Sequence, residues 1–387
     1  FLVLVSCYGF GWFALYASEF KGLGEHIAAS AGFIQNFFLL NEIAYFERGV
    51  DIKPLIHLWS LAIEEQFYLL WPAIIWIFYK ARINLLVAIL ILVLISFFIN
   101  IYSIKSDPIT TFYSPLSRFW ELLVGALWAC VSLKKSQEAR QLGQTTLNVV
   151  SWVGLLLIAI TIFWISSKNL FPGWWALLPT IGATLLILAN SEASVNKLFL
   201  SNNVMVWLGV ISYPLYLWHW PLLVLPSTRF GRPLTLLERL FFIALTALAA
   251  DLTHRFLEKP ISNRNYSTQK VIRYSTLGTI SCVAISASIL LTDQGTIKLP
   301  NGSSVSISEV MAKPQVYLDD CHVNNGEVLS GDCTYGDKSS EKTIVLYGDS
   351  HAAQWFPALE KLANENGFKL VSLTKSACPA PEVRKFK

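Results

Sequence analysis

Short polar patterns interrupt the apolar stretches of this 387-residue sequence. In HLWSLAIEEQFYLLWP, residues 57–72, the side chains of His57, Ser60 and Glu64 share one face of a helix, and Glu65 points about a quarter-turn away. A charge in the middle of a membrane-spanning helix costs about 3 kcal/mol, so ionisable groups found there are candidates for function. His57, Glu64 and Glu65 are therefore candidate catalytic residues.

Two further patterns supply candidate substrate-binding residues. In FYSPLSRFWELLVGALWA, residues 112–129, Arg118 and Glu121 are three positions apart and can pair. This pair either binds substrate or only locks helices together. In ISYPLYLWHWPLLVLP, residues 211–226, His219 is either a substrate-binding group or a hydrogen-bonded residue at a helix interface.

The tetrapeptide GDSH, residues 348–351, follows the apolar run TIVLY and precedes a predicted helix. Gly348 permits a tight turn, and backbone N–H groups at a helix start can stabilise a developing oxyanion. Ser350 is therefore a candidate nucleophile, with Gly348 and Asp349 as candidate substrate-binding residues. A serine needs a base, and we expect it from later in the chain because adjacent His351 points elsewhere.

These patterns require a membrane scaffold. The chain is 54% hydrophobic and 14% charged, with 14 Trp and 14 Tyr, residues that concentrate where bilayer meets water. The formal net charge of +4 comes from scattered cations that form no basic face, so nucleic acid is not an expected partner. No pairing of cysteine with histidine indicates a metal site.

Nine crossings of a lipid bilayer are predicted, at about 1–17, 60–79, 84–104, 115–133, 147–166, 174–190, 204–225, 236–254 and 274–291. The stretch 27–46 is excluded because Gln35, Asn36, Asn41 and Glu42 would face lipid, and it is interpreted as interfacial or re-entrant.

The cations predict the orientation of the crossings. One set of loops carries Lys80, Arg82, Lys134, Lys135, Arg140, Lys197, Arg255, Lys259, Arg264, Lys270 and Arg273, more than the opposite set, and should be cytoplasmic. The segment after residue 291 then lies outside the cytoplasm. There Cys321 and Cys333 are a candidate disulfide, with two free thiols as the alternative.

The predicted fold is a polytopic α-helical membrane domain followed by the start of an α/β domain. Its predicted parts are a membrane domain at 1–291, a linker at 292–315 and a partial extracytoplasmic domain at 316–387. In the last part, a strand at 343–347, a helix at 352–365 and the strand FKLVSLT form a βαβ unit. Because the chain opens on Phe1 inside an apolar run, we expect a fragment that lacks its N-terminus.

The motifs quoted above and RFLEKP, in this order, resemble the membrane acyltransferase-3 family, and the tail resembles the SGNH domain fused to many bacterial members. The resemblance implies an O-acyltransferase in the bacterial cytoplasmic (inner) membrane, with a periplasmic C-terminal domain. Acetyl-CoA or another acyl-CoA would be the donor. The acceptor would be a surface glycan of the lipopolysaccharide O-antigen or peptidoglycan class.

The resemblance also implies missing parts. The family's first-helix histidine and RxxR segment would precede Phe1, and the later SGNH blocks, including DxxH, would follow Lys387. The piece alone is therefore expected to be inactive. Two alternatives remain: a transporter or flippase with an exported accessory domain, and a membrane-anchored carbohydrate esterase.

Overall fold

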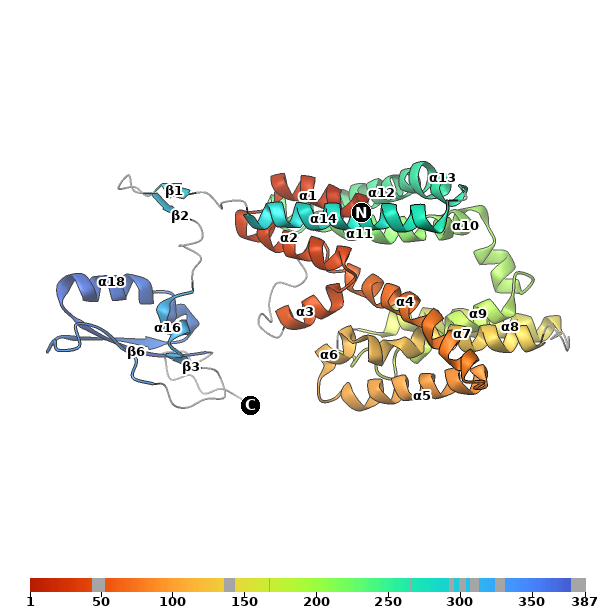
Figure 1. Ribbon diagram of the computed structural model, residues 1–387, viewed down its shortest axis with the longest axis horizontal. Helices are drawn as coiled ribbons and strands as arrows, with labels where there is room; N and C mark the ends of the chain where they lie inside the picture. Colours follow the sequence, from red (N-terminus) through yellow and green to blue (C-terminus); the bar gives the residue numbers. More distant parts are fainter. Residues whose placement is uncertain are drawn as a thin grey trace. The chain divides into compact units, whose positions relative to one another are not determined.

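The chain forms two compact units, Phe1–Thr292 and Asp293–Lys387, in this computed structural model. The structure describes residues 1–43, 53–135, 143–166, 168–264, 266–291, 296–298, 304–306, 313–323 and 331–376. The first unit is helical and the second contains a small sheet, and each is described by itself (Figure 1).

The helices of the first unit vary widely in length. Their bounds are α1 Leu2–Ala14, α2 Ala17–Ala31, α3 Gln35–Ile43, α4 Leu58–Lys80, α5 Leu85–Ser103, α6 Pro108–Tyr113, α7 Pro115–Lys135, α8 Gln144–Trp164, α9 Leu177–Ala189, α10 Asn203–Val210, α11 Ser212–Phe230, α12 Leu236–Thr253, α13 Lys259–Ser262 and α14 Thr268–Leu291. Two π-helical turns, η2 Asn196–Leu200 and η3 His254–Glu258, interrupt this series.

Five helices in the described part are long and apolar enough to cross a membrane: α4, α5, α8, α14 and the segment Pro108–Leu133, which takes in α6 and most of α7. The pair α10–α11, bent by 71°, gives a sixth if it counts as one span. A multi-pass membrane protein is therefore confirmed, but nine full crossings are not found.

Two physical causes explain why fewer helices than the nine predicted are long and apolar enough to cross the membrane. Helices α1 and α9 each have 13 residues. At a rise of 1.5 Å per residue they are about 20 Å long, against a hydrocarbon core of about 30 Å. Helix α12 carries Glu238, Arg239 and Asp251 within 18 residues, which lowers its apolar character.

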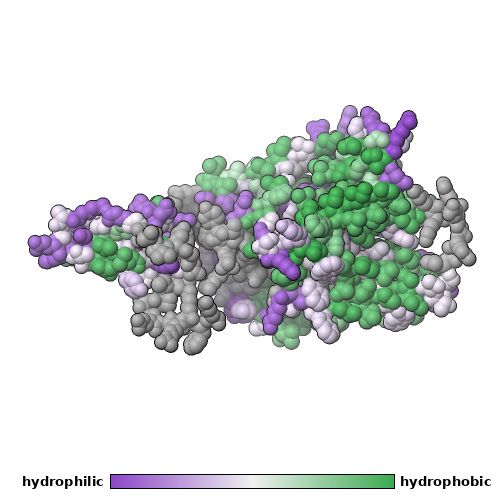
Figure 2. Space-filling view, turned by 90° about the horizontal axis from the view of Figure 1, so that it is seen from below, coloured by the Kyte–Doolittle hydropathy of each residue, from purple (hydrophilic) through white to green (hydrophobic). Residues whose placement is uncertain are grey.

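The surface of the helical unit is rich in hydrophobic side chains. Figure 2 shows broad hydrophobic areas on the visible face of this unit. Leu69, Phe163 and Leu237 are each at least 80% exposed. Contiguous apolar surface of this kind is unfavourable in water and is typical of contact with lipid.

Two groups of helices make up the unit, with α4 between them (Figure 1). One group is α1, α2, α11, α12 and α14, whose buried core includes Cys7, Leu23, Trp218 and Ile289. The other contains α5, α7, α8 and α9. Within it, α8 and α9 approach closely at Gly154, where an added Cβ would lie 2.9 Å from the carbonyl oxygen of Gly182.

The C-terminal unit is built around strand β6, Lys369–Lys375. Strand β5, Thr343–Gly348, lies parallel to it along its length; β3, His322–Val323, is also parallel, and β4, Thr334–Gly336, is antiparallel. The short helix α16 is Gln315–Leu318, and a separate hairpin pairs β1, Thr296–Lys298, with β2, Ser304–Ser306.

The predicted βαβ unit is confirmed, since β5 leads through two helices into the parallel β6. The predicted single helix is divided into α17, Ser350–Ala353, and α18, Phe356–Asn366, where Pro357 occupies the first turn of α18. Gly367, with φ +65°, ends α18 as the sequence predicted. Phe356 and Leu370, both fully buried, pack into the core of this unit.

Candidate functional site

His57 stands at the start of α4 and is almost fully buried, with 7% of its surface exposed. Its ring centroid lies 5.3 Å from those of Tyr216 and His219 on α11. Both of its ring nitrogens are buried and form no hydrogen bond with a side chain of the described residues, while the ring interacts with the backbone of Leu217 on α11. Such an imidazole can accept or deliver a proton without first breaking a bond to another side chain.

Hydroxyl groups join α4 to α11 beside this ring. The Tyr216 hydroxyl donates to the carbonyl oxygen of His57 at 2.5 Å, and its oxygen also lies 2.5 Å from Ser60 Oγ. Tyr216 Oη therefore accepts the Ser60 proton, because its own proton points to the carbonyl. The structure thus brings together two helix faces that the sequence indicated separately.

His219 is oriented by its own helix. Its Nδ1 lies 2.6 Å from the carbonyl oxygen of Tyr216, and because a carbonyl can only accept, Nδ1 carries the proton. This tautomer leaves the lone pair of Nε2 available for another group.

The carboxylates of α4 lie outside this cluster. Glu64 is exposed, Glu65 is half-buried, and neither has a hydrogen-bond or ion-pair partner in the described part of the chain. Both interact electrostatically with Tyr213, one turn before Tyr216. Glu64 is seven residues from His57, which is about 10 Å along a helix. The polar face of α4, from His57 to Glu64, therefore lies beside α11 for about two turns of α4.

Arg118 and Glu121 form the ion pair that their spacing predicted. Arg118 Nη2 donates to Glu121 Oε2 at 3.0 Å, and its Nε lies 2.9 Å from Oε1. Arg118 Nη1 is buried without a hydrogen-bond partner among the described residues, and so remains able to donate to one more acceptor. Because both residues belong to α7, the ion pair joins no two helices, and Arg118 Nη1 can still hold a ligand oxygen.

Aromatic rings surround this guanidinium. Arg118 Cζ lies 5.4 Å from the ring centroid of Trp59, 5.6 Å from that of Phe112 and 5.5 Å from that of Phe171. The sequence prediction missed these three rings, which come from separate segments. Trp59 is two residues from His57. The first turn of α4 therefore contacts both Arg118 and the α11 residues Tyr216 and His219.

In the C-terminal unit, Ser350 opens α17 directly after β5. Gly348 has φ +149°, and an added Cβ would lie 2.7 Å from Ala352 Cβ, so the turn requires glycine. The Asp349 carboxylate accepts the backbone N–H of His351 at 2.9 Å. The Ser350 side chain is exposed and has no hydrogen-bond partner among the described residues. Its base stays a prediction.

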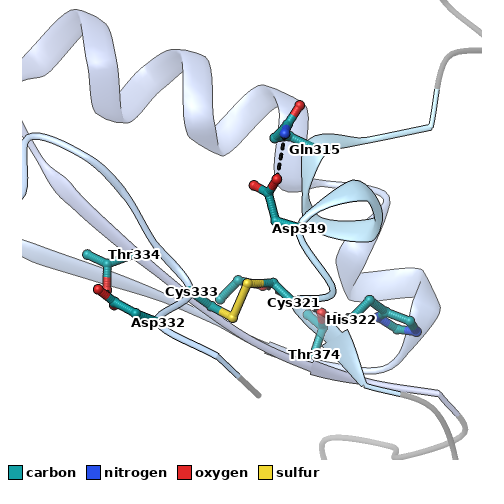
Figure 3. The surroundings of a disulfide bond; sticks show 9 residues. Gln315, Asp319, Cys321, His322, Asp332, Cys333, Thr334 and Thr374 are labelled. Carbon is teal, nitrogen blue, oxygen red and sulfur yellow. Dashed lines mark hydrogen bonds between the residues drawn. A yellow bond between two sulfur atoms is a disulfide. The ribbon is translucent and has the colours of Figure 1, made fainter.

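The structure joins Cys321 to Cys333 in a disulfide with a Cα–Cα distance of 5.5 Å (Figure 3). Next to it, His322 Nδ1 lies 3.1 Å from Thr374 Oγ1 and Nε2 lies 3.0 Å from Ser376 Oγ. Thr374 pairs in register with Gly348. The disulfide thus lies beside the sheet edge at which the Ser350 turn begins.

Metal ligands do not gather in the described residues, where no group of three or more His, Cys, Asp or Glu side chains could hold an ion.

Comparison with known proteins gives two family matches. The model of an acyltransferase domain matches residues 1–255, and that of an SGNH domain fused to such acyltransferase domains matches residues 320–387. No solved structure matches the chain significantly.

Curated relatives match over the membrane part. The chain is 30% identical over 258 residues to the peptidoglycan O-acetyltransferase OatA of Listeria monocytogenes, covering 64% of this chain and 41% of that protein. It is 29% identical over 269 residues to YrhL of Bacillus subtilis, covering 66% and 42%, and 28% identical over 250 residues to the O-acetyltransferase OatA of Staphylococcus aureus, covering 62% and 41%. The chain therefore spans about two fifths of the length of these relatives.

Proposed function

Because this chain belongs to the acyltransferase family whose model matches residues 1–255, we propose that it is part of a membrane O-acetyltransferase that acts on a cell-wall glycan. The similarity to peptidoglycan O-acetyltransferases supports this acceptor class. The observation that carries the proposal is the buried His57, whose two ring nitrogens form no hydrogen bond with a side chain in the described residues and whose ring contacts Tyr216 and His219.

We propose acetyl-CoA as the donor. The acceptor hydroxyl attacks the thioester carbonyl carbon while His57 takes the hydroxyl proton. The carbon–sulfur bond then breaks, the proton passes to the leaving thiolate, and an ester replaces the thioester. Arg118 Nη1 is a donor that can stabilise the developing oxyanion. Glu64, Glu65 and Glu121 would supply further polar contacts to the substrates.

The C-terminal unit supplies the second part of the proposal. Ser350 is placed as an exposed nucleophile, with Gly348 and Asp349 shaping its turn. The disulfide of this unit is consistent with an oxidising compartment outside the cytoplasm. The acetyl group would pass to the Ser350 hydroxyl, or directly to a sugar hydroxyl.

The test is acetyl transfer from radiolabelled acetyl-CoA in membrane vesicles that contain the protein in its full genomic length. His57→Gln should lower the rate by about 10²-fold or more, as expected for a general base. The matched control is His254→Gln, since His254 pairs with Glu258 just after α12 and has no hydrogen bond to His57, Tyr216 or His219 in the described residues. Normal transfer by the His57 variant would refute its role.

Ser350→Ala separates the two routes. Loss of glycan acetylation by this variant, together with labelled acetyl held as an ester on Ser350 of the unsubstituted protein when no glycan is present, supports passage through Ser350. Unchanged glycan acetylation supports direct transfer to the sugar. Hydrolysis of glycan acetate without dependence on acetyl-CoA would instead favour an esterase.

A further inference from the structure

A buried polar cluster beside α4 has no part in the reaction described above. It contains His26 of α2, 3% exposed, and Gln35 of α3, fully buried. Glu42 of α3 and Lys53 complete it, with side chains 23% and 24% exposed. Polar groups are tolerated at such burial only when they are paired, so their partners show what the cluster holds in place.

Two neighbours fix the tautomer of His26. Ser30 Oγ donates to Gln35 Oε1 at 3.3 Å, which leaves the amide nitrogen of Gln35 to donate to His26 Nδ1 at 2.5 Å. Because Nδ1 is an acceptor, the ring proton is on Nε2, which lies 3.4 Å from Glu42 Oε2. The N–H side of the imidazole therefore lies next to the Glu42 carboxylate, at 3.4 Å, without forming a hydrogen bond with it.

The other oxygen of Glu42 forms a close ion pair with Lys53 Nζ. Burial raises the pKa of Glu42, but the adjacent N–H group of His26 and the hydrogen bond and charge of Lys53 outweigh it and lower the pKa to about 2. Glu42 is therefore ionised at neutral pH. It holds Lys53 through an ion pair that water screens only in part.

Lys53 begins the turn that leads into α4. Its carbonyl oxygen accepts the backbone N–H of Ile56 at 3.3 Å and the indole N–H of Trp220 at 2.8 Å. Three residues separate Lys53 from His57, and Trp220 is adjacent to His219. A displacement of Lys53 would consequently be transmitted to both imidazoles of the candidate site.

We propose that Glu42 and Lys53, oriented by His26, are positioning residues that set the distance between His57 and His219. This inference rests on the proposed function, because it takes His57 as the reacting base. The cluster contacts no reacting atom in this scheme. It acts by fixing the turn of residues 53–57 against α11.

The experiment compares Lys53→Met, Glu42→Gln and the double variant, in the full-length protein in vesicles. Lys53→Met should lower kcat by about tenfold to a hundredfold while KM for acetyl-CoA changes less than about twofold, because misplacement affects the reaction step more than binding. Lys53→Arg keeps the charge and should restore most of the kcat. The two single effects should be non-additive, since both break one ion pair.

The matched control pair is Glu192 and Lys197, an ion pair at 3.8 Å whose side chains are each 69% exposed. Glu192→Gln and Lys197→Met should leave kcat unchanged, as exposed pairs contribute little. If Lys53→Met and Glu42→Gln retain kcat while His57→Gln is inactive, the positioning role is wrong and the proposed function stands. If Lys53→Arg is as impaired as Lys53→Met, the ion pair is not the cause. An active His57→Gln variant would refute the proposed function itself.

Discussion

Three buried histidines in the described residues differ in what their ring nitrogens contact. His322 contacts two hydroxyls, one through each ring nitrogen. His26 accepts from Gln35 through Nδ1, and its Nε2 lies 3.4 Å from a Glu42 oxygen without forming a hydrogen bond. Neither nitrogen of His57 forms a hydrogen bond with a side chain of the described residues, and its ring interacts with the backbone of Leu217. A buried imidazole that no side chain holds has less of a structural explanation than one held through both nitrogens, as His322 is. This contrast is why His57 is assigned the chemical role.

His322 gives a pH-dependent prediction. Burial lowers its pKa, and the nearby Asp349 carboxylate opposes this shift only in part. The imidazole is therefore neutral in the folded unit, while an unfolded histidine takes a proton below about pH 6.5. Stability of the C-terminal unit should fall as pH drops through 6.5 towards 5, because the unfolded state then binds more protons. Pulse proteolysis in urea, detected by a C-terminal tag, measures this.

The control for this prediction is His322→Gln, which cannot titrate. The carboxylates make the stability of both proteins depend on pH, so the relevant quantity is the difference in the free energy of unfolding between the unsubstituted protein and the variant. This difference should become smaller as pH falls from 7 to 5. A constant difference would contradict the assigned pKa direction.

Sequence patterns anticipated several of these residues but not their partners. Helical spacing placed His57 with Ser60 and paired Arg118 with Glu121, since both relations are local. The approach of His57 to His219, 162 positions later, depends on which helices pack together. The rings of Phe112 and Phe171 around Arg118 were missed for the same reason.

At the level of elements, α3 shows how polar groups can be placed within a membrane unit. The polar side chains of the stretch 27–46 predict an interfacial or re-entrant segment. In the structure Asn36 is fully buried, donates to the carbonyl oxygen of Tyr113 at 3.1 Å and accepts from Gln66 at 2.9 Å. The helix is nine residues long, and its polar side chains at Gln35, Asn36 and Glu42 face protein partners that composition alone does not identify.

The close contact of α8 with α9 gives a prediction about stability. Gly154→Ala should destabilise the helical unit, because the new Cβ would lie 2.9 Å from the carbonyl oxygen of Gly182, a backbone atom. Gly125→Ala in α7 is the control, since nothing lies within 4 Å of its added Cβ. It should stabilise by about 0.5–1 kcal/mol through helix propensity. Thermal unfolding in detergent compares the two, and equal midpoints would contradict the predicted packing.

For the whole molecule, the distribution of cations predicts which loops face the cytoplasm. Positive charge predicts that the turn with Arg82 is inside and the loop with Lys168 is outside. The structure offers a check on this assignment, because α5, α7 and α8 lie between the two positions and each belongs to a candidate span. An odd number of crossings places Arg82 and Lys168 on opposite sides, even though the total is lower than the nine predicted.

Single cysteines test this topology. In a background with Cys7, Cys130, Cys282 and Cys378 replaced by Ala and the disulfide kept, Lys168→Cys should react with a membrane-impermeant maleimide in intact cells. Arg82→Cys should react only after permeabilisation. Both positions are exposed in the structure, so a lack of reaction reflects the membrane and not burial. Labelling of both cysteines in intact cells would contradict the three crossings. Labelling of Arg82→Cys in intact cells and of Lys168→Cys only after permeabilisation would invert the predicted orientation and put the disulfide-bearing unit in the cytoplasm.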